Sequence, residues 1–126
     1  MRRKARELKV EVETVYLGEQ SRPEVDRYTF AYTVTMENTG TVAAKLLGRR
    51  WVITDANGKV VEVMGEGVVG EHPYLRPGEA FQYTSEATIS TPVGSMQGSY
   101  QLLADDGVPF EAPIEAFSLA MPRRLH

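Results

Sequence analysis

Hydrophobic and polar residues alternate with a period of two along most of this 126-residue chain. The clearest example is the segment 28–37, where aromatic and aliphatic residues occupy the even positions and threonine, alanine and glutamate the odd ones. Successive side chains of a β-strand point to opposite faces of a sheet. The pattern is therefore typical of an antiparallel strand with one buried face.

Further segments have the features of strands, and no segment predicts a helix longer than one turn. The expected strands cover residues 8–17, 47–53, 60–64, 81–89, 98–104 and 108–119. In the second of these, one face carries Leu47, Arg49, Trp51 and Ile53. We expect an interruption of the last strand at Pro113, because proline lacks a backbone N–H group.

Seven short strands separated by turns predict an all-β fold, an antiparallel β-sandwich of the fibronectin type III-like (immunoglobulin-like) kind. Asn57-Gly58 and Asp105-Asp106-Gly107 are expected to be tight turns. Trp51 falls on the third strand, where such sandwiches bury a tryptophan. Tyr100 could form a tyrosine corner, in which the hydroxyl bonds to upstream backbone. A small closed barrel is the alternative.

The composition indicates a single domain over residues 1–126, with frayed ends at 1–6 and 122–126. The formal net charge of −3 gives no basic excess, so no nucleic-acid partner is expected. The absence of cysteine excludes disulfides, thiolate metal sites and cysteine nucleophiles. Neither a signal peptide nor an apolar stretch long enough to span a membrane is found, so we expect a cytoplasmic protein without membrane contact.

The run Gly65-Glu66-Gly67-Val68-Val69-Gly70 fits the pattern GxGxxG. A dinucleotide site needs a helix after these glycines, but Pro73 and Pro77 prevent one, and Glu66 and Glu71 oppose phosphate. The amides of Gly65, Gly67 and Gly70 could still form an anion-binding nest. The other interpretation is that the glycines permit positive φ or close backbone approach in a loop.

Two further groups of residues are candidates for binding. Glu71, His72, Asp105 and Asp106 could hold a divalent cation if two turns approach each other, but we favour solvated turns, because acidic turns are common without a metal. Tyr74, Leu75 and Arg76 lie in a proline-rich loop that could contact a protein partner. The alternative is that Tyr74 folds back onto the sandwich.

No catalytic arrangement is found in the sequence. There is no G-x-S-x-G motif, and one of the two histidines, His126, is the last residue. We therefore expect no catalytic residues, no enzymatic activity and no cofactor.

Several stretches from Asn38 onward closely resemble the bacterial ApaG (CorD) family. They are 38–40, 49–55, 65–70, 77–79, 81–85, 91–100 and 117–119. The resemblance implies a fibronectin type III-like sandwich, a genetic association with cobalt resistance and magnesium efflux, and gene neighbourhood with a diadenosine tetraphosphate hydrolase. It also implies relatives that act as protein-binding modules in eukaryotic F-box and polymerase-interacting proteins.

The sequence thus predicts a small, non-catalytic module that binds a protein partner. The alternative is a sensor of nucleotide, pyrophosphate or divalent cation that uses the glycine run.

Overall fold

Two antiparallel sheets face each other in this computed structural model, which describes residues 4–122. The strands are β1 (Leu8–Tyr16), β2 (Tyr28–Asn38), β3 (Ala44–Asp55), β4 (Val60–Glu66), β5 (Tyr74–Leu75), β6 (Ala80–Ile89), β7 (Val93–Ala104) and β8 (Pro109–Ala120). Single 3-10 turns, η1 (Gly18–Gln20) and η2 (Pro23–Val25), join β1 to β2. None of the helices in the described residues is long and apolar enough to cross a membrane.

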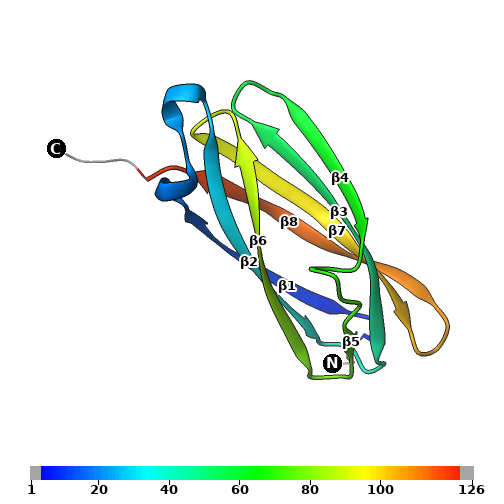
Figure 1. Cartoon of the computed structure of the whole chain (residues 1–126). Helices are drawn as coiled ribbons and strands as arrows, with labels where there is room; N and C mark the ends of the chain where they lie inside the picture. Colours follow the sequence, from blue (N-terminus) through cyan, green and yellow to red (C-terminus); the bar gives the residue numbers. More distant parts are fainter. Residues whose placement is uncertain (1–3, 123–126) are drawn as a thin grey trace.

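The smaller sheet has the order β1-β2-β6 and the larger sheet the order β4-β3-β7-β8, with β5 paired to β3 beyond the end of β4 (Figure 1). Seven long strands and the two-residue β5 therefore form a β-sandwich, as the alternating pattern predicts. The sheets differ in width, and β1 contacts β8 along one side of the molecule, so β4 and β6 are outermost on the other side.

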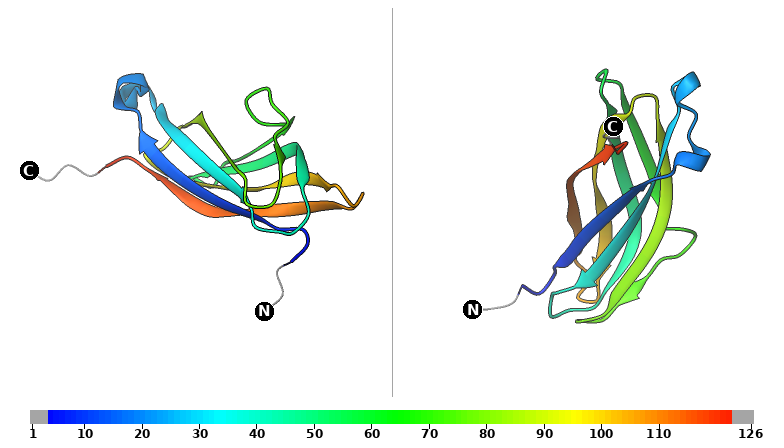
Figure 2. Two further views of the ribbon diagram at one scale, coloured as in Figure 1. Left: turned by 90° about the horizontal axis from the view of Figure 1, so that it is seen from below. Right: turned by 90° about the vertical axis from the view of Figure 1, so that its left-hand side faces the viewer.

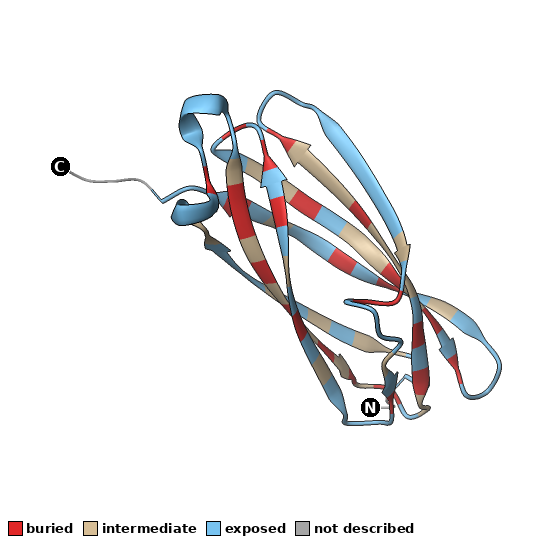
Figure 3. Cartoon of the chain, in the orientation of Figure 1, coloured by how far each residue is buried: buried red, intermediate tan, exposed pale blue. Residues whose placement is uncertain are grey.

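The core lies between the sheets, and buried residues alternate with exposed ones along the strands (Figure 3). Trp51 is buried on β3 as predicted, with 2% of its surface exposed. Its indole contacts the rings of Tyr32, Phe117 and Tyr100, at centroid distances of 5.3, 5.8 and 6.4 Å. Aromatic pairs in such tilted or edge-on arrangements add to the stability gained from burial.

Two irregularities in the larger sheet differ from the sequence predictions. The register of β3 on β7 shifts between Leu46 and Gly48, so Leu46 is buried and Leu47, predicted to share a face with Trp51, is exposed. In β8, the ladder continues through Pro113, which pairs with Ser99. Proline is tolerated there because β8 is an edge strand, and the register shift instead lies opposite Gln97.

The predicted tyrosine corner at Tyr100 is wrong. The Tyr100 hydroxyl lies 2.5 Å from the Tyr83 hydroxyl of β6, and the two side chains form a buried hydrogen bond between the sheets. Burial raises the pKa of Tyr83 to about 12 and also raises that of Tyr100. Both rings are therefore neutral at physiological pH.

The N-terminal segment differs from the expected frayed end at residues 4–6. The carbonyl of Ala5 accepts hydrogen bonds from the amides of Thr41 and Val42, both at 3.0 Å. Arg6 pairs with Asp106 at 2.5 Å. Residues 1–3 and 123–126, which complete the predicted frayed ends, lie outside the described residues. The first and the last described segments of the chain leave the sandwich at opposite ends of its long axis (Figure 2).

Candidate functional site

The glycine run begins inside β4 and ends in a small hairpin. Gly65 pairs with Arg49 in the ladder between β3 and β4. The amide of Gly67 then donates to the carbonyl of Leu47 at 2.9 Å. Val68 and Glu71 exchange two backbone hydrogen bonds, of 2.9 and 2.8 Å, around a two-residue turn.

The turn residues are Val69 and Gly70, with φ angles of 43° and 79°. Positive φ at both central residues is the signature of a type I′ hairpin turn, which asparagine and glycine adopt most easily. Positive φ is a genuine outlier for a β-branched residue such as Val69. Val68 beside it is completely buried in the core, whereas Val69 is 55% exposed at the tip of the hairpin.

Arg49 clamps the start of this hairpin from the inner face of β3. One terminal nitrogen of its guanidinium (Nη1) donates to the carbonyls of Glu66 and Gly67, at 2.9 and 2.8 Å. The guanidinium lies across Gly65, where a Cβ atom would come within 2.7 Å of it. The absence of a side chain at Gly65 thus gives the arginine room to reach the loop carbonyls.

This geometry agrees with the interpretation in which the glycines shape the backbone. The three glycines lie in three different local structures: Gly65 in a ladder, Gly67 bonded to Leu47, and Gly70 in the turn. A Cβ at Gly67 would lie 2.2 Å from the carbonyl oxygen of Glu71. The amide of Gly67 already has a carbonyl partner, so it is not directed toward an anion.

The structure separates the three residues expected to contact a partner. Tyr74 is 46% exposed, and its hydroxyl donates to the Asp105 carboxylate at 2.5 Å. That hydrogen bond is the main reason why the pKa of Tyr74 is raised. Arg76 is exposed, and its amide donates to the Glu79 carboxylate at 2.7 Å. Leu75 is buried in the core, so the prediction that it contacts a partner is wrong.

The predicted metal residues do not form a site. Among residues 4–122, no group of three or more histidine, aspartate or glutamate side chains is placed to hold a metal ion. Asp105 accepts from Tyr74, and Asp106 pairs with Arg6. Tyr74, two residues after His72, is the residue of this segment that bonds to the 105–106 turn.

A cavity of about 270 Å³ lies near the other end of β4, between the two sheets. Ile53 and Val61 line it from the larger sheet, and β6 contributes Thr88 and Ile89. The sequence did not indicate this cavity, because it depends on the unequal width of the sheets.

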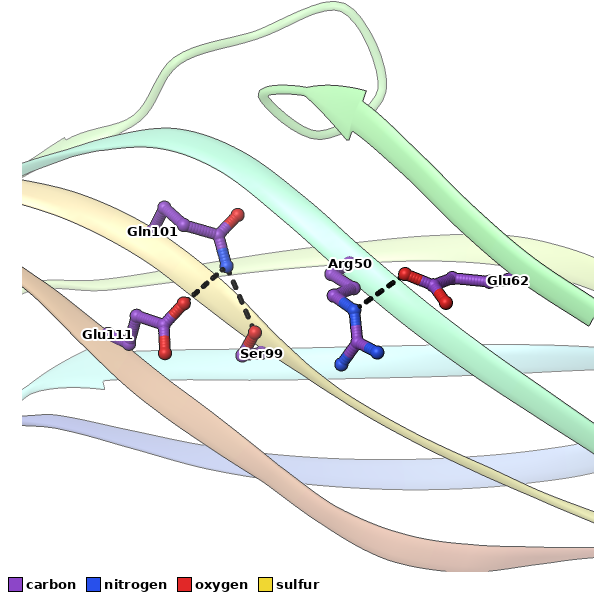
Figure 4. Close-up of polar contacts among 5 residues, drawn as sticks. All are labelled: Arg50, Glu62, Ser99, Gln101 and Glu111. Atoms are coloured by element: carbon purple, nitrogen blue, oxygen red, sulfur yellow. Dashed lines mark hydrogen bonds and ion pairs between the residues drawn. The ribbon is translucent and has the colours of Figure 1, made fainter.

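The outer face of the larger sheet is polar in its middle (Figure 4). Arg50 donates to Glu62 at 2.8 Å, and Gln101 donates to Ser99 at 2.9 Å and Glu111 at 3.5 Å. These groups satisfy one another across the strands at the surface. We place the candidate recognition surface at the glycine hairpin, where a positive φ and an exposed apolar side chain coincide at Val69.

Comparison with known proteins agrees with this architecture. Residues 18–104 match the ApaG domain family. The chain is 82% identical over 126 residues to "Protein ApaG" of Methylococcus capsulatus, covering 100% of both chains, and 62% identical over 120 residues to that of Thiobacillus denitrificans, covering 95% and 94%. A crystal structure of an ApaA protein from Bordetella pertussis superposes with a TM-score of 0.94 at 48% identity, covering 98% of this chain and 100% of that one.

Proposed function

The chain belongs to the ApaG domain family, and from this premise we propose that it is a non-catalytic module that recognises a protein partner through the tip of its glycine hairpin. Val69 carries the proposal, because it combines a strained backbone with an exposed apolar side chain. A residue held in a sparsely populated φ region costs about 1–3 kcal/mol, and such strain is concentrated at functional sites.

The rest of the hairpin supports this role for Val69. Val68 anchors the hairpin in the core, and Arg49 holds the two carbonyls that precede it. The tip is therefore presented from a rigid base, which reduces the entropy lost when a partner binds. Tyr74, fixed by Asp105, is a second exposed apolar side chain, in the segment that follows the hairpin. Aromatic residues in fixed positions are frequent anchors of protein interfaces.

The association with cobalt resistance and magnesium efflux is part of the proposal. Since the described residues hold no cluster suited to a metal ion, we propose that the module acts on cation efflux through a protein partner. The alternative, a nucleotide or cation sensor, has no supporting observation in the hairpin, because the amides of Gly67, Val68 and Glu71 all bond to carbonyls.

Replacement of Val69 by asparagine tests the proposal. Asparagine adopts positive φ more easily, so V69N should raise the free energy of unfolding by about 1 kcal/mol. The same change removes the apolar contact. We expect proteins retained from a lysate of the source cells by the wild-type chain to be depleted at least tenfold with V69N, as measured by quantitative mass spectrometry.

Val15→Asn is the matched control, because Val15 is also exposed but lies in the regular strand β1. It should leave the retained proteins unchanged. The proposal fails if V69N is folded, as shown by its urea unfolding curve, and retains the same proteins as the wild type.

A further inference from the structure

The smaller sheet ends before it covers β4. Its last strand is β6, whereas the larger sheet continues past β3 to β4 (Figure 1). Every residue of β4 except Gly65 is exposed. The sandwich is therefore open along the side where β6 and β4 are the outermost strands.

Two valines of β4 face this opening. Val61 pairs with Ile53 and Val63 pairs with the buried Trp51, so both valines lie on the face that is directed toward the smaller sheet. They are nevertheless 44% and 39% exposed. Exposed apolar residues on an inward face indicate that a covering element is missing.

The chain itself fills one half of the opening and leaves the other half free. The glycine hairpin rises from the larger sheet toward the level of the smaller one (Figure 2). Val68 of this hairpin is fully buried in the core. Toward the end of β6, the space remains as the cavity between Val61, Ile53 and Ile89. The unfilled part of the opening is therefore a place beside β6 where a short additional strand would fit.

The chemistry of this position specifies its occupant. β6 pairs with β2 on one side only, so its other edge presents backbone groups that an extended chain can pair with. The valine floor favours apolar side chains at every second position. On the outer face, Glu86 of β6 is exposed and forms no ion pair with any of residues 4–122, so it favours lysine or arginine at the positions between.

We infer that a partner protein adds an extended segment, with alternating apolar and basic residues, to the free edge of β6 and over Val61 and Val63. A second copy of this chain would fit less well if it docked through its own edge strand, β4. The outer face of that β4 would bring Glu62 and Glu66 toward Glu86. At the mouth of the cavity, the negative charges of Asp26 and Asp55 balance the positive charges of Arg27 and Lys59. The preference for a basic segment therefore comes from Glu86.

The test uses the full chain labelled with ¹⁵N and a synthetic probe, an acetylated and amidated seven-residue peptide in which lysine and valine alternate. We expect saturable amide shifts in 60–63 and 80–89, and at least tenfold slower hydrogen exchange at some amides of β6. One comparison peptide has glutamate in place of lysine, and another has the same residues in two blocks. Both should bind at least tenfold more weakly.

Variants separate the two features of the site. Val61→Glu places a charge on the apolar floor and should weaken binding of the lysine–valine peptide at least tenfold, whereas the exposed Val15→Glu on β1 should not. Glu86→Lys should reverse the preference between the lysine and glutamate peptides. The reversal requires a folded protein with an intact groove, so loss of structure cannot imitate it.

The inference is wrong if 1 mM peptide causes no saturable change, if the block peptide binds equally well, or if the shifts lie on β1 and β8. Protection of β6 that rises with protein concentration without peptide would assign the edge to a second copy and also overturn it. The inference rests on the proposed protein-binding function but concerns a separate surface. Loss of partner capture with V69N can therefore stand even if the peptide test fails.

Discussion

At the scale of single residues, the bond between Tyr83 and Tyr100 joins the two sheets through the core. The two hydroxyls are buried 2.5 Å apart, and they form a hydrogen bond with each other. A buried hydroxyl without a partner loses its hydration and gains nothing in return. The pair therefore acts as a unit, and removing one hydroxyl costs more than removing both.

We expect Tyr83→Phe and Tyr100→Phe each to lower the free energy of unfolding by about 1–3 kcal/mol. The double variant should cost clearly less than the sum of the two, because it leaves no orphaned hydroxyl. Urea unfolding of the four proteins measures this coupling. Additive costs would mean that the hydroxyls do not depend on each other.

Alkaline pH gives a second measurement on the same pair. The pKa of Tyr83 rises from 10.0 to about 12 on folding, because burial penalises the charged phenolate. Its contribution to stability is fully present below pH 10 and is lost as pH rises through about 12. We expect the double phenylalanine variant to lose less stability than the wild type between pH 10 and 12, in denaturation curves recorded at each pH.

At the scale of elements, alternation and turn residues were sufficient to predict that seven long strands exist, but β7 begins at Val93, before its predicted start at Gly98. Alternation also could not predict the bulge in β3. A strict alternation places Leu47 with Trp51, whereas the extra residue at the bulge turns Leu47 to the surface. The position of an arginine, Arg49, on an inward face was the one available signal that this side chain bonds to the glycine loop. Leu75 was assigned wrongly because its pairing with Ala44 is a long-range contact that local sequence does not encode.

The glycines of the hairpin have different roles, and a matched pair of substitutions separates them. Gly67 and Gly58 both have positive φ, of 57° and 81°, but only at Gly67 does a Cβ meet other backbone. We expect Gly58→Ala to cost about 1–2 kcal/mol. Gly67→Ala should cost more, since its Cβ would lie 2.2 Å from the Glu71 carbonyl oxygen. Equal losses in urea unfolding would contradict the close approach.

The same element should not bind phosphate. Because the amide of Gly67 bonds to Leu47 and two glutamates lie in the segment, we expect millimolar pyrophosphate or ADP to leave the amide signals of Gly65, Gly67 and Gly70 unshifted in NMR spectra. Saturable shifts confined to these three residues would restore the anion-binding interpretation.

At the scale of the whole molecule, Asp55 couples two turns at the end opposite to Tyr74. Its carboxylate accepts from the amides of Asn57 and Lys59, both at 2.9 Å, and from the hydroxyl of Ser90 at 3.1 Å. The amide of Ala56 in turn donates to the Thr91 hydroxyl at 3.0 Å. The β3–β4 hairpin is thereby joined to the connection between β6 and β7.

These bonds favour the charged carboxylate, and the bond from Lys59 contributes most to lowering the pKa of Asp55 below its ordinary value of 3.8. The stabilisation is present above pH 3.8 and is lost as pH falls through the lower folded pKa. We therefore expect Asp55→Asn to be less stable than the wild type at pH 6, with a difference that shrinks below pH 4. Thermal unfolding of both proteins at several pH values measures this difference, and a difference that stayed constant with pH would contradict the prediction.

The placement of the two described ends has a mechanical consequence. Lys4–Arg6 lie at the end where β1 begins, and Met121 follows β8 at the other end, where its amide bonds to Pro92. Tension between the ends therefore pulls β1 and β8 along their own axes. It loads the nine residue pairs of β1 with β2, and the ladder of β8 with β7, simultaneously in shear. A pull at the β3–β4 turn would instead open ladder bonds one after another, so resistance to stretching should depend strongly on direction.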